Sequence, residues 1–196
     1  RSSDLVDFWQ SDEVTLLLKK VIGFLANDEY EFEFVKLSKE PDQQLFFDIG
    51  KQDTFPVTGA ERVILFSGGL DSLAGAVECA ARGENLVLVS HRPVSTLDKR
   101  QRDLVAELKK MFSSVQIAHI PVWVNKKATS REATQRTRSF LFAALGALVA
   151  DSINVSSVRF FENGIVSLNL PVAEEVLQSR ASRTTHPISL QLFTQL

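Results

Sequence analysis

Cysteine is nearly absent from this chain of 196 residues, in which Cys79 is the only one. A single cysteine excludes a disulfide framework within the chain and a zinc site built from several cysteines. Because Cys79 stands inside a helix-like apolar run, we expect it to be a small core residue.

Long hydrophobic runs are also lacking. The longest, Phe140 to Ala150, is too short to span a membrane and predicts a buried helix. No signal-peptide pattern opens the chain, so we expect a cytoplasmic protein with no membrane partner. Because the sequence begins with Arg1 and ends inside a helix-like run, we also expect an excised part of a longer protein, truncated at its C-terminus.

Positive charge is scarce in one segment and negative charge in another, although the net charge of the chain is only −2. Residues 1–61 hold 6 Lys/Arg against 13 Asp/Glu, and residues 91–140 hold 11 against 4. The basic segment suits a polyanionic ligand such as ATP or a nucleic acid. The alternative is a solvated face of one exposed helix that carries the positive side chains Lys99, Arg100, Arg102, Lys109 and Lys110.

The most informative stretch is a glycine-containing hexapeptide between an apolar run, residues 63–66, and a helix-like run, residues 73–82. Its members are Ser67, Gly68, Gly69, Leu70, Asp71 and Ser72. A strand, a glycine loop and a helix start together aim backbone N–H groups and a positive helix end at an anion. The alternative is an ordinary tight turn between a strand and a helix.

Asp71 indicates which anion this loop would bind. A carboxylate beside a phosphate repels it unless a cation lies between them, so the loop predicts a triphosphate that carries Mg²⁺. Asp71 is accordingly a candidate magnesium ligand and catalytic residue. No lysine follows the second glycine, which excludes a GxxxxGK[ST] phosphate loop.

Residues 1–58 predict a small α+β unit, and residues 59–196 predict the nucleotide-binding domain. Apolar residues recur at helical spacing up to about residue 26, and residues 30–37 and 45–50 predict a hairpin. In the second part, strands over 62–66, 86–90, 115–124 and 158–161 alternate with helices. This order predicts an α/β fold with a doubly wound parallel sheet, in which ligands bind beyond the carboxyl ends of the strands.

Three further segments leave predicted strand ends and supply candidate site residues. Ser90 ends the second strand, and Arg138 precedes the apolar run 140–150, where it could neutralise charge on a leaving pyrophosphate. Glu162 and Asn163 follow the fourth strand, as a carboxylate and an amide that could bind a substrate. A polar stretch beyond them adds the substrate candidates Asn169, Arg183, Thr184 and His186. The alternative is a structured loop that satisfies its own backbone.

The hexapeptide resembles the pyrophosphate loop of the PP-loop ATP pyrophosphatase superfamily. Together with Arg-Thr-Arg-Ser at 136–139, Glu-Asn-Gly at 162–164 and Arg-Thr-Thr-His-Pro at 183–187, it resembles 7-cyano-7-deazaguanine synthase-like proteins of bacterial anti-phage defence operons. The residue after Arg138 is Ser139, where the true synthase has an asparagine. That enzyme's cysteine-rich zinc site is also absent from this sequence.

The resemblance implies an adenine nucleotide alpha hydrolase-like, Rossmann-like fold and a ligase that uses ATP and Mg²⁺. A carboxylate on a small deazapurine or a protein residue would be adenylated with release of pyrophosphate, and an amine would then displace AMP to give an amide or nitrile. Arg138 and Glu162 would serve catalysis, Ser90 would lie near the nucleotide, and operon-encoded proteins would be partners. Two alternatives stay open: a tRNA-modifying enzyme with the same loop, or a nucleotide-binding regulatory module that does not turn over.

Overall fold

A computed structural model describes residues 5–36, 48–49, 53–54, 59–91, 95–124, 137–164, 167 and 183–196. The chain divides into two compact units. The sheet unit comprises Phe46–Ala133 and Leu141–Glu162, and the helical unit comprises Arg1–Leu45, Thr134–Phe140 and Asn163–Leu196. The predicted domain boundary after residue 58 stays a prediction, because residues 55–58 lie outside the described part.

The sheet unit is built on four parallel strands in the order β5-β4-β3-β6. They are β3 (Arg62–Leu65), β4 (Leu86–His91), β5 (Ile117–Val122) and β6 (Val158–Arg159). The chain moves outward from β3 to β5 and then returns to the other side of β3, so strand order reverses between β3 and β6. The predicted α/β class with a parallel sheet is confirmed.

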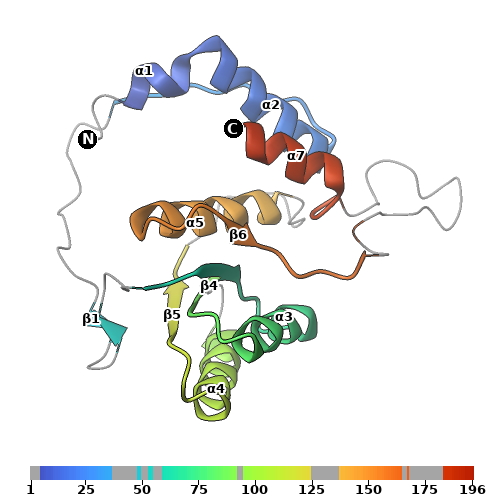
Figure 1. Cartoon of the computed structure of the whole chain (residues 1–196). Coiled ribbons are helices and arrows are strands. Elements are labelled where there is room, and N and C mark those ends of the chain that lie inside the picture. The colour runs from blue at the N-terminus through green and yellow to red at the C-terminus, as the bar shows by residue number, and fades with distance from the viewer. Residues whose placement is uncertain are drawn as a thin grey trace, which may run out of the picture. The chain divides into compact units, whose positions relative to one another are not determined.

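Helices cover both faces of this sheet, as its uninterrupted apolar strands require. Because side chains alternate along a strand, Ile64 and Leu88 pack with α3 (Leu70–Ala81) and α4 (Ser95–Met111), whereas Val63 and Val87 pack with α5 (Arg138–Ser152). Figure 1 shows α3 and α4 on one side of the strands and α5 on the other.

A close contact joins α3 to the segment after β6. A Cβ built on Gly75 would lie 2.1 Å from Cγ of Phe161, so glycine is required for α3 to pack this near the ring. Phe161 directly precedes Glu162. This packing therefore sets where the chain emerges beyond β6.

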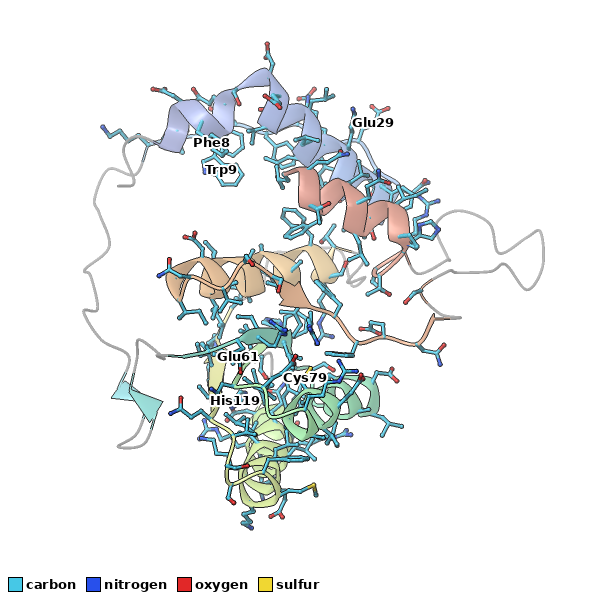
Figure 2. All side chains as sticks on the ribbon, in the orientation of Figure 1. Phe8, Trp9, Glu29, Glu61, Cys79 and His119 are labelled. Carbon is cyan, nitrogen blue, oxygen red and sulfur yellow. The ribbon has the colours of Figure 1, made fainter. Side chains whose placement is uncertain are left out.

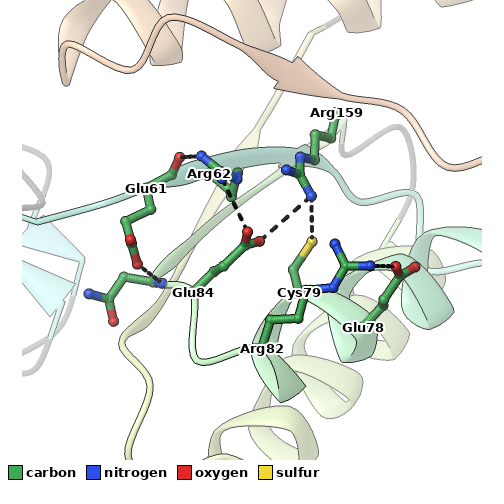
Figure 3. A network of polar contacts seen from close by, with 8 residues as sticks. Glu61, Arg62, Glu78, Cys79, Arg82, Glu84 and Arg159 are labelled. Carbon is green, nitrogen blue, oxygen red and sulfur yellow. Dashed lines mark hydrogen bonds and ion pairs between the residues drawn. The ribbon is translucent and has the colours of Figure 1, made fainter.

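A polar network joins the amino ends of β3 and β4 to the end of α3 (Figure 3). Nη2 of Arg62 lies 3.1 Å from a Glu84 carboxylate oxygen, and Nη1 of Arg159 donates to Sγ of Cys79 at 3.3 Å. Burial raises the pKa of the Cys79 thiol, and the neighbouring Glu84 raises it further. Cys79 has no exposed surface, which confirms the predicted core position and leaves a thiol poorly suited to act as a nucleophile.

The helical unit contains α1 (Leu5–Gln10), α2 (Asp12–Ala26) and α7 (Pro187–Gln195). The predicted helix end at Asn27 is confirmed, since Asn27 adopts a left-handed conformation and its N–H bonds the carbonyl of Gly23 at 2.8 Å. Ser11 is the N-cap of α2, but its hydroxyl donates to the carbonyl of Phe8 at 2.7 Å and makes no capping bond to the helix.

The predicted strand over residues 30–37 is wrong for the described residues 30–36, which belong to no strand. Their aromatic side chains do alternate, but the rings stack on one another, 6.1 Å apart for Phe32 and Phe34, and Phe34 stacks on Trp9 of α1. Figure 2 shows the ring of Trp9 extending from α1 beside Phe8. Nε2 of Gln10 donates to the carbonyl of Phe34 at 2.9 Å. In the part of the chain that the structure describes, residues 30–36 therefore pack against α1 and do not pair with a second strand.

The described strand at 48–49 pairs with residues 53–54 instead. These are β1 (Asp48–Ile49) and β2 (Asp53–Thr54), which form an antiparallel pair inside the segment predicted to hold one strand and a linker. Only residues 50–52 separate the two strands in the sequence, so their pairing has a lower loop-closure cost than a pairing with residues 30–37 would have.

The remaining predicted strands and helices are present, with ends that differ from the prediction by a few residues: β6 ends at Arg159 rather than 161, and β5 covers Ile117–Val122 rather than 115–124. The helix predicted over the apolar run 140–150 is α5, which begins at Arg138 after the turn residue Thr137; residues 125–136 lie outside the described part. In the regions that the structure describes, no helix is long and apolar enough to cross a membrane.

Candidate functional site

The hexapeptide leaves the carboxyl end of β3 and enters α3, as its sequence predicts. Gly68 has a positive φ of 79°, a backbone conformation that residues with a Cβ rarely adopt. Gly69 is extended and caps the helix, so α3 begins at Leu70. Ser67, Leu70 and Asp71 are exposed.

The carbonyl groups at the base of this loop are held by side chains of neighbouring elements. Oγ of Ser90, at the end of β4, donates to the carbonyl of Phe66 at 2.6 Å. Nε2 of Gln101, from α4, donates to the carbonyl of Ser67 at 3.0 Å. Both side chains are completely buried. The loop therefore rests on two fixed donors from two different elements.

The two loop hydroxyls complete this arrangement. Oγ of Ser72 donates to the carbonyl of Gly69 at 3.1 Å and lies 3.1 Å from Oγ of Ser67. The first turn of a helix has no intrahelical acceptors for its N–H groups, which here belong to Leu70, Asp71 and Ser72. With the loop carbonyls already bonded, the site offers donors and the positive end of a helix dipole, which is the chemistry of an anion site.

Glu162 lies near Asp71 at the same edge of the sheet, because both follow parallel strands that neighbour each other. Partial burial raises the pKa of the Glu162 carboxyl group above its ordinary value, and the negative charge of Asp71 raises it further. Two carboxylates that repel each other fit a cation between them. Among the described residues, no group of three or more His, Cys, Asp and Glu could hold a metal ion by itself.

Ser90, predicted to lie near the nucleotide, belongs to a buried hydrogen-bonded chain. Its hydroxyl has one hydrogen, which goes to the carbonyl of Phe66, so Oγ accepts from Nε2 of His119 at 2.9 Å. This pair does not have the arrangement of a Ser/His nucleophile, because the serine proton is directed to a backbone carbonyl. It fixes the end of β3, from which the loop starts.

The other predicted site residues belong to the helical unit. Arg138 is the exposed first residue of α5, and Asn163 is exposed. Nη1 of Arg183 donates to the carbonyl of Phe24 at 2.9 Å, and its guanidinium lies 5.0 Å from the centre of the Phe24 ring. Thr184 is half-buried. Asn169 lies outside the described residues.

His186 has a structural explanation that the sequence already signals. It is the N-cap of α7, where Nδ1 accepts a hydrogen bond from the N–H of Ile188 at 3.2 Å. Pro187 at the first helical position is typical of a helix start, and this signal identifies His186 as a cap. The structure thus brings together Arg183 and His186, which both contact Phe24.

Two residues of the loop's support were missed from the sequence: Gln101 and His119. Gln101 occupies an apolar stripe of α4 in which Leu97 and Leu108 also take part, and His119 interrupts an apolar strand. A polar residue at such a position is the signal that could have identified them, because a buried polar group needs a hydrogen-bond partner.

Comparison of the chain with protein-family models, curated proteins and solved structures gave no match in any of the three.

Proposed function

We propose that this chain binds ATP with its β- and γ-phosphates on residues 67–72. The observation that carries the proposal is the bonding of the loop: the carbonyls of Phe66, Ser67 and Gly69 each accept a hydrogen bond from a serine or glutamine side chain. The exposed part of the loop is then left with N–H groups at a helix start, and phosphate oxygens are acceptors that match them.

The finer fold assignment belongs to the same proposal. Strand order reverses between β3 and β6, and α3 and α4 cover the face opposite to α5. This supports a doubly wound, Rossmann-like sheet of the adenine nucleotide alpha hydrolase type. In such sheets the ligand lies beyond the carboxyl ends of the strands, where strand order reverses.

Asp71 and Glu162 are the residues that would hold Mg²⁺ with the triphosphate. The fit rests on their positions after neighbouring parallel strands, at one edge of the sheet. Partial burial raises the pKa of Glu162, and the negative charge of Asp71 raises it further, as expected for two carboxylates on this edge. A divalent cation would remove this repulsion and neutralise phosphate charge.

The reaction that we propose is carboxylate activation. A carboxylate oxygen of the acceptor attacks the α-phosphorus of ATP, the bond from that phosphorus to the bridging oxygen breaks, and pyrophosphate leaves with both electrons of that bond. Ammonia or another amine then attacks the acyl carbon and AMP departs, which gives an amide; a nitrile would require a further dehydration. Support comes from the resemblance of residues 67–72 to pyrophosphate loops. The catalytic role of Arg138 stays a prediction from the sequence.

The products of ATP consumption test this chemistry. The chain is incubated with MgATP, ammonium and candidate carboxylic acids, and the nucleotides are separated by chromatography. Release of AMP and pyrophosphate in equal amounts is expected. Release of ADP and phosphate without AMP would contradict carboxylate adenylation, and binding without any consumption would favour the regulatory-module alternative.

A tRNA-modifying enzyme remains the second candidate, because Lys99, Arg100 and Arg102 are exposed on α4. Two basic residues of this helix are already paired with carboxylates of the same helix: Arg102 with Asp98 at 2.8 Å and Lys110 with Glu107 at 2.6 Å. Such pairing lowers the charge available for phosphates. RNA binding that weakens steeply with salt and is lost in a Lys99→Ala/Arg100→Ala variant would favour this candidate.

A further inference from the structure

Gln101 is a polar residue placed where an apolar one would be expected. It lies on the buried stripe of α4, and its side chain has no exposed surface. Only one end of its amide is satisfied: Nε2 donates to the carbonyl of Ser67, whereas Oε1 is buried with no hydrogen-bond partner among the described residues. An uncharged apolar side chain of similar length would avoid this unsatisfied oxygen.

The amide orientation follows from its surroundings. If the two ends of the amide were exchanged, Oε1 would face the carbonyl oxygen of Ser67, and two acceptors would repel each other. The donor must therefore point at the loop. Gln101 also lies close to Gly68, the residue after Ser67. A Cβ built on Gly68 would lie 3.0 Å from Cγ of Gln101.

The hydrogen bond from Gln101 to the carbonyl of Ser67 also constrains the N–H of Gly68, which belongs to the same peptide group. In a trans peptide the C=O and the N–H point to opposite sides. When Nε2 of Gln101 holds the carbonyl of Ser67 on the side of α4, the N–H of Gly68 faces away from α4. Gly68 itself is buried, so its N–H could reach a ligand only beside the donors of the first turn of α3.

We propose that Gln101 is a positioning residue that fixes the Ser67–Gly68 peptide so that the Gly68 N–H binds the terminal phosphates of the nucleotide. The inference rests on the proposed function and adds a residue of α4 to the binding machinery. Gln101 does not touch the ligand. It acts through the peptide that it holds.

Two variants test this role. Gln101→Met keeps the length of the side chain and removes the donor, and Gln101→Glu keeps the shape and replaces the donor with an acceptor. Gln116→Met is the matched control, because Gln116 is an exposed glutamine of the same unit. Gln101→Met removes the unsatisfied Oε1 but also removes the donor to the Ser67 carbonyl, and these two effects on stability oppose each other. We therefore expect a thermal midpoint close to that of the unchanged chain.

Binding of inorganic pyrophosphate, MgATP and adenosine is then measured by calorimetry. Loss of one oriented donor should weaken pyrophosphate and MgATP about fivefold in Gln101→Met, with a larger loss in Gln101→Glu. Adenosine affinity should not change, because the nucleoside does not use the loop. Equal weakening of adenosine, or unchanged pyrophosphate affinity, would overturn the inference.

Crystal structures of the unchanged chain and of Gln101→Glu separate this inference from the proposed function. If the unchanged chain binds neither ATP nor pyrophosphate, the proposed function fails. The orientation of the Ser67–Gly68 peptide in the two crystal structures still tests whether Gln101 positions it. A rotated peptide in Gln101→Glu would support the inference. An unchanged peptide would overturn it.

Discussion

Gly68 combines two demands that only glycine meets. Its φ of 79° is unfavourable for other residues, and the space where a Cβ would point is occupied by Gln101. Gly83 has nearly the same φ, 80°, but nothing lies within 4 Å of a Cβ built there. Substitution of Gly83 therefore measures the cost of the positive φ alone, and substitution of Gly68 measures that cost together with the clash with Gln101.

We expect Gly83→Ala to lower the free energy of unfolding by about 1 kcal/mol, which is the cost of a left-handed residue. Gly68→Ala should cost about 1 kcal/mol more, because it also displaces Gln101. Urea unfolding of both variants measures the difference. Equal losses would mean that Gln101 gives way freely and does not constrain the loop.

Glu162 supplies a pH-dependent prediction. Because partial burial and Asp71 raise its pKa in the folded chain, Glu162 favours folding only while it is protonated. This contribution is fully present below the pKa of the unfolded chain, about 4.3, and is lost as the pH rises through the higher folded value. Glu162→Gln should therefore leave the thermal midpoint unchanged near pH 4 and raise it at pH 7.

The same substitution should weaken Mg²⁺ binding in the presence of ATP about tenfold, since one of the two carboxylates is removed. Asn163→Ala is the control, because it alters the next exposed residue and leaves both carboxylates intact. A midpoint that falls at pH 7 in Glu162→Gln would show that the carboxylate is stabilising. The proposed cation pair would then be wrong.

At the scale of elements, sequence patterns predict those helices, strands and loops that are formed by residues close together in the sequence. The strand, loop and α3 were predicted because an apolar run, two glycines and a helical pattern follow one another directly. The segment at 30–36 was misread because alternating aromatics suit a strand and also suit a row of rings stacked against a helix. Period-two alternation gives the direction of side chains but does not identify the partner that they pack against.

The contact between α3 and Phe161 links an element to the site. Gly75→Ala would place a methyl group 2.1 Å from the Phe161 ring, and we expect a loss of about 1–3 kcal/mol in the free energy of unfolding. Movement of Phe161 should also shift Glu162 and weaken Mg²⁺ binding. Gly164→Ala is the control, because nothing lies within 4 Å of its added Cβ. Chemical denaturation of both variants tests the difference, which should vanish if the ring can swing aside.

At the scale of the whole molecule, the sequence predicts the parallel sheet but not which strands neighbour each other. The return of β6 to the side of β3 depends on contacts between residues almost a hundred positions apart, such as Ile64 and Arg159. The same holds for Gln101 and Ser67, which are 34 positions apart. Long-range pairs of this kind leave no periodic pattern, so the loop was predicted and its support was not.

The proposed division of labour is that the sheet unit binds the triphosphate. Its loop, Ser90 and Glu162 gather at the carboxyl ends of β3, β4 and β6. Arg183 and His186, by contrast, are bonded within the helical unit to Phe24 and Ile188. For these two residues the structure supplies a packing role, and their predicted contact with a substrate stays a prediction.

Equilibrium binding of MgATP to this chain, beside a Ser67→Ala/Asp71→Ala variant, tests the central claim most directly. The variant removes one loop hydroxyl and the loop carboxylate but leaves Gly68 and Gln101 in place. We predict that the unchanged chain binds MgATP and that the variant does not, with similar thermal midpoints for both in the absence of nucleotide. Equal binding by both chains, or no binding by the unchanged chain, would contradict a triphosphate site at residues 67–72.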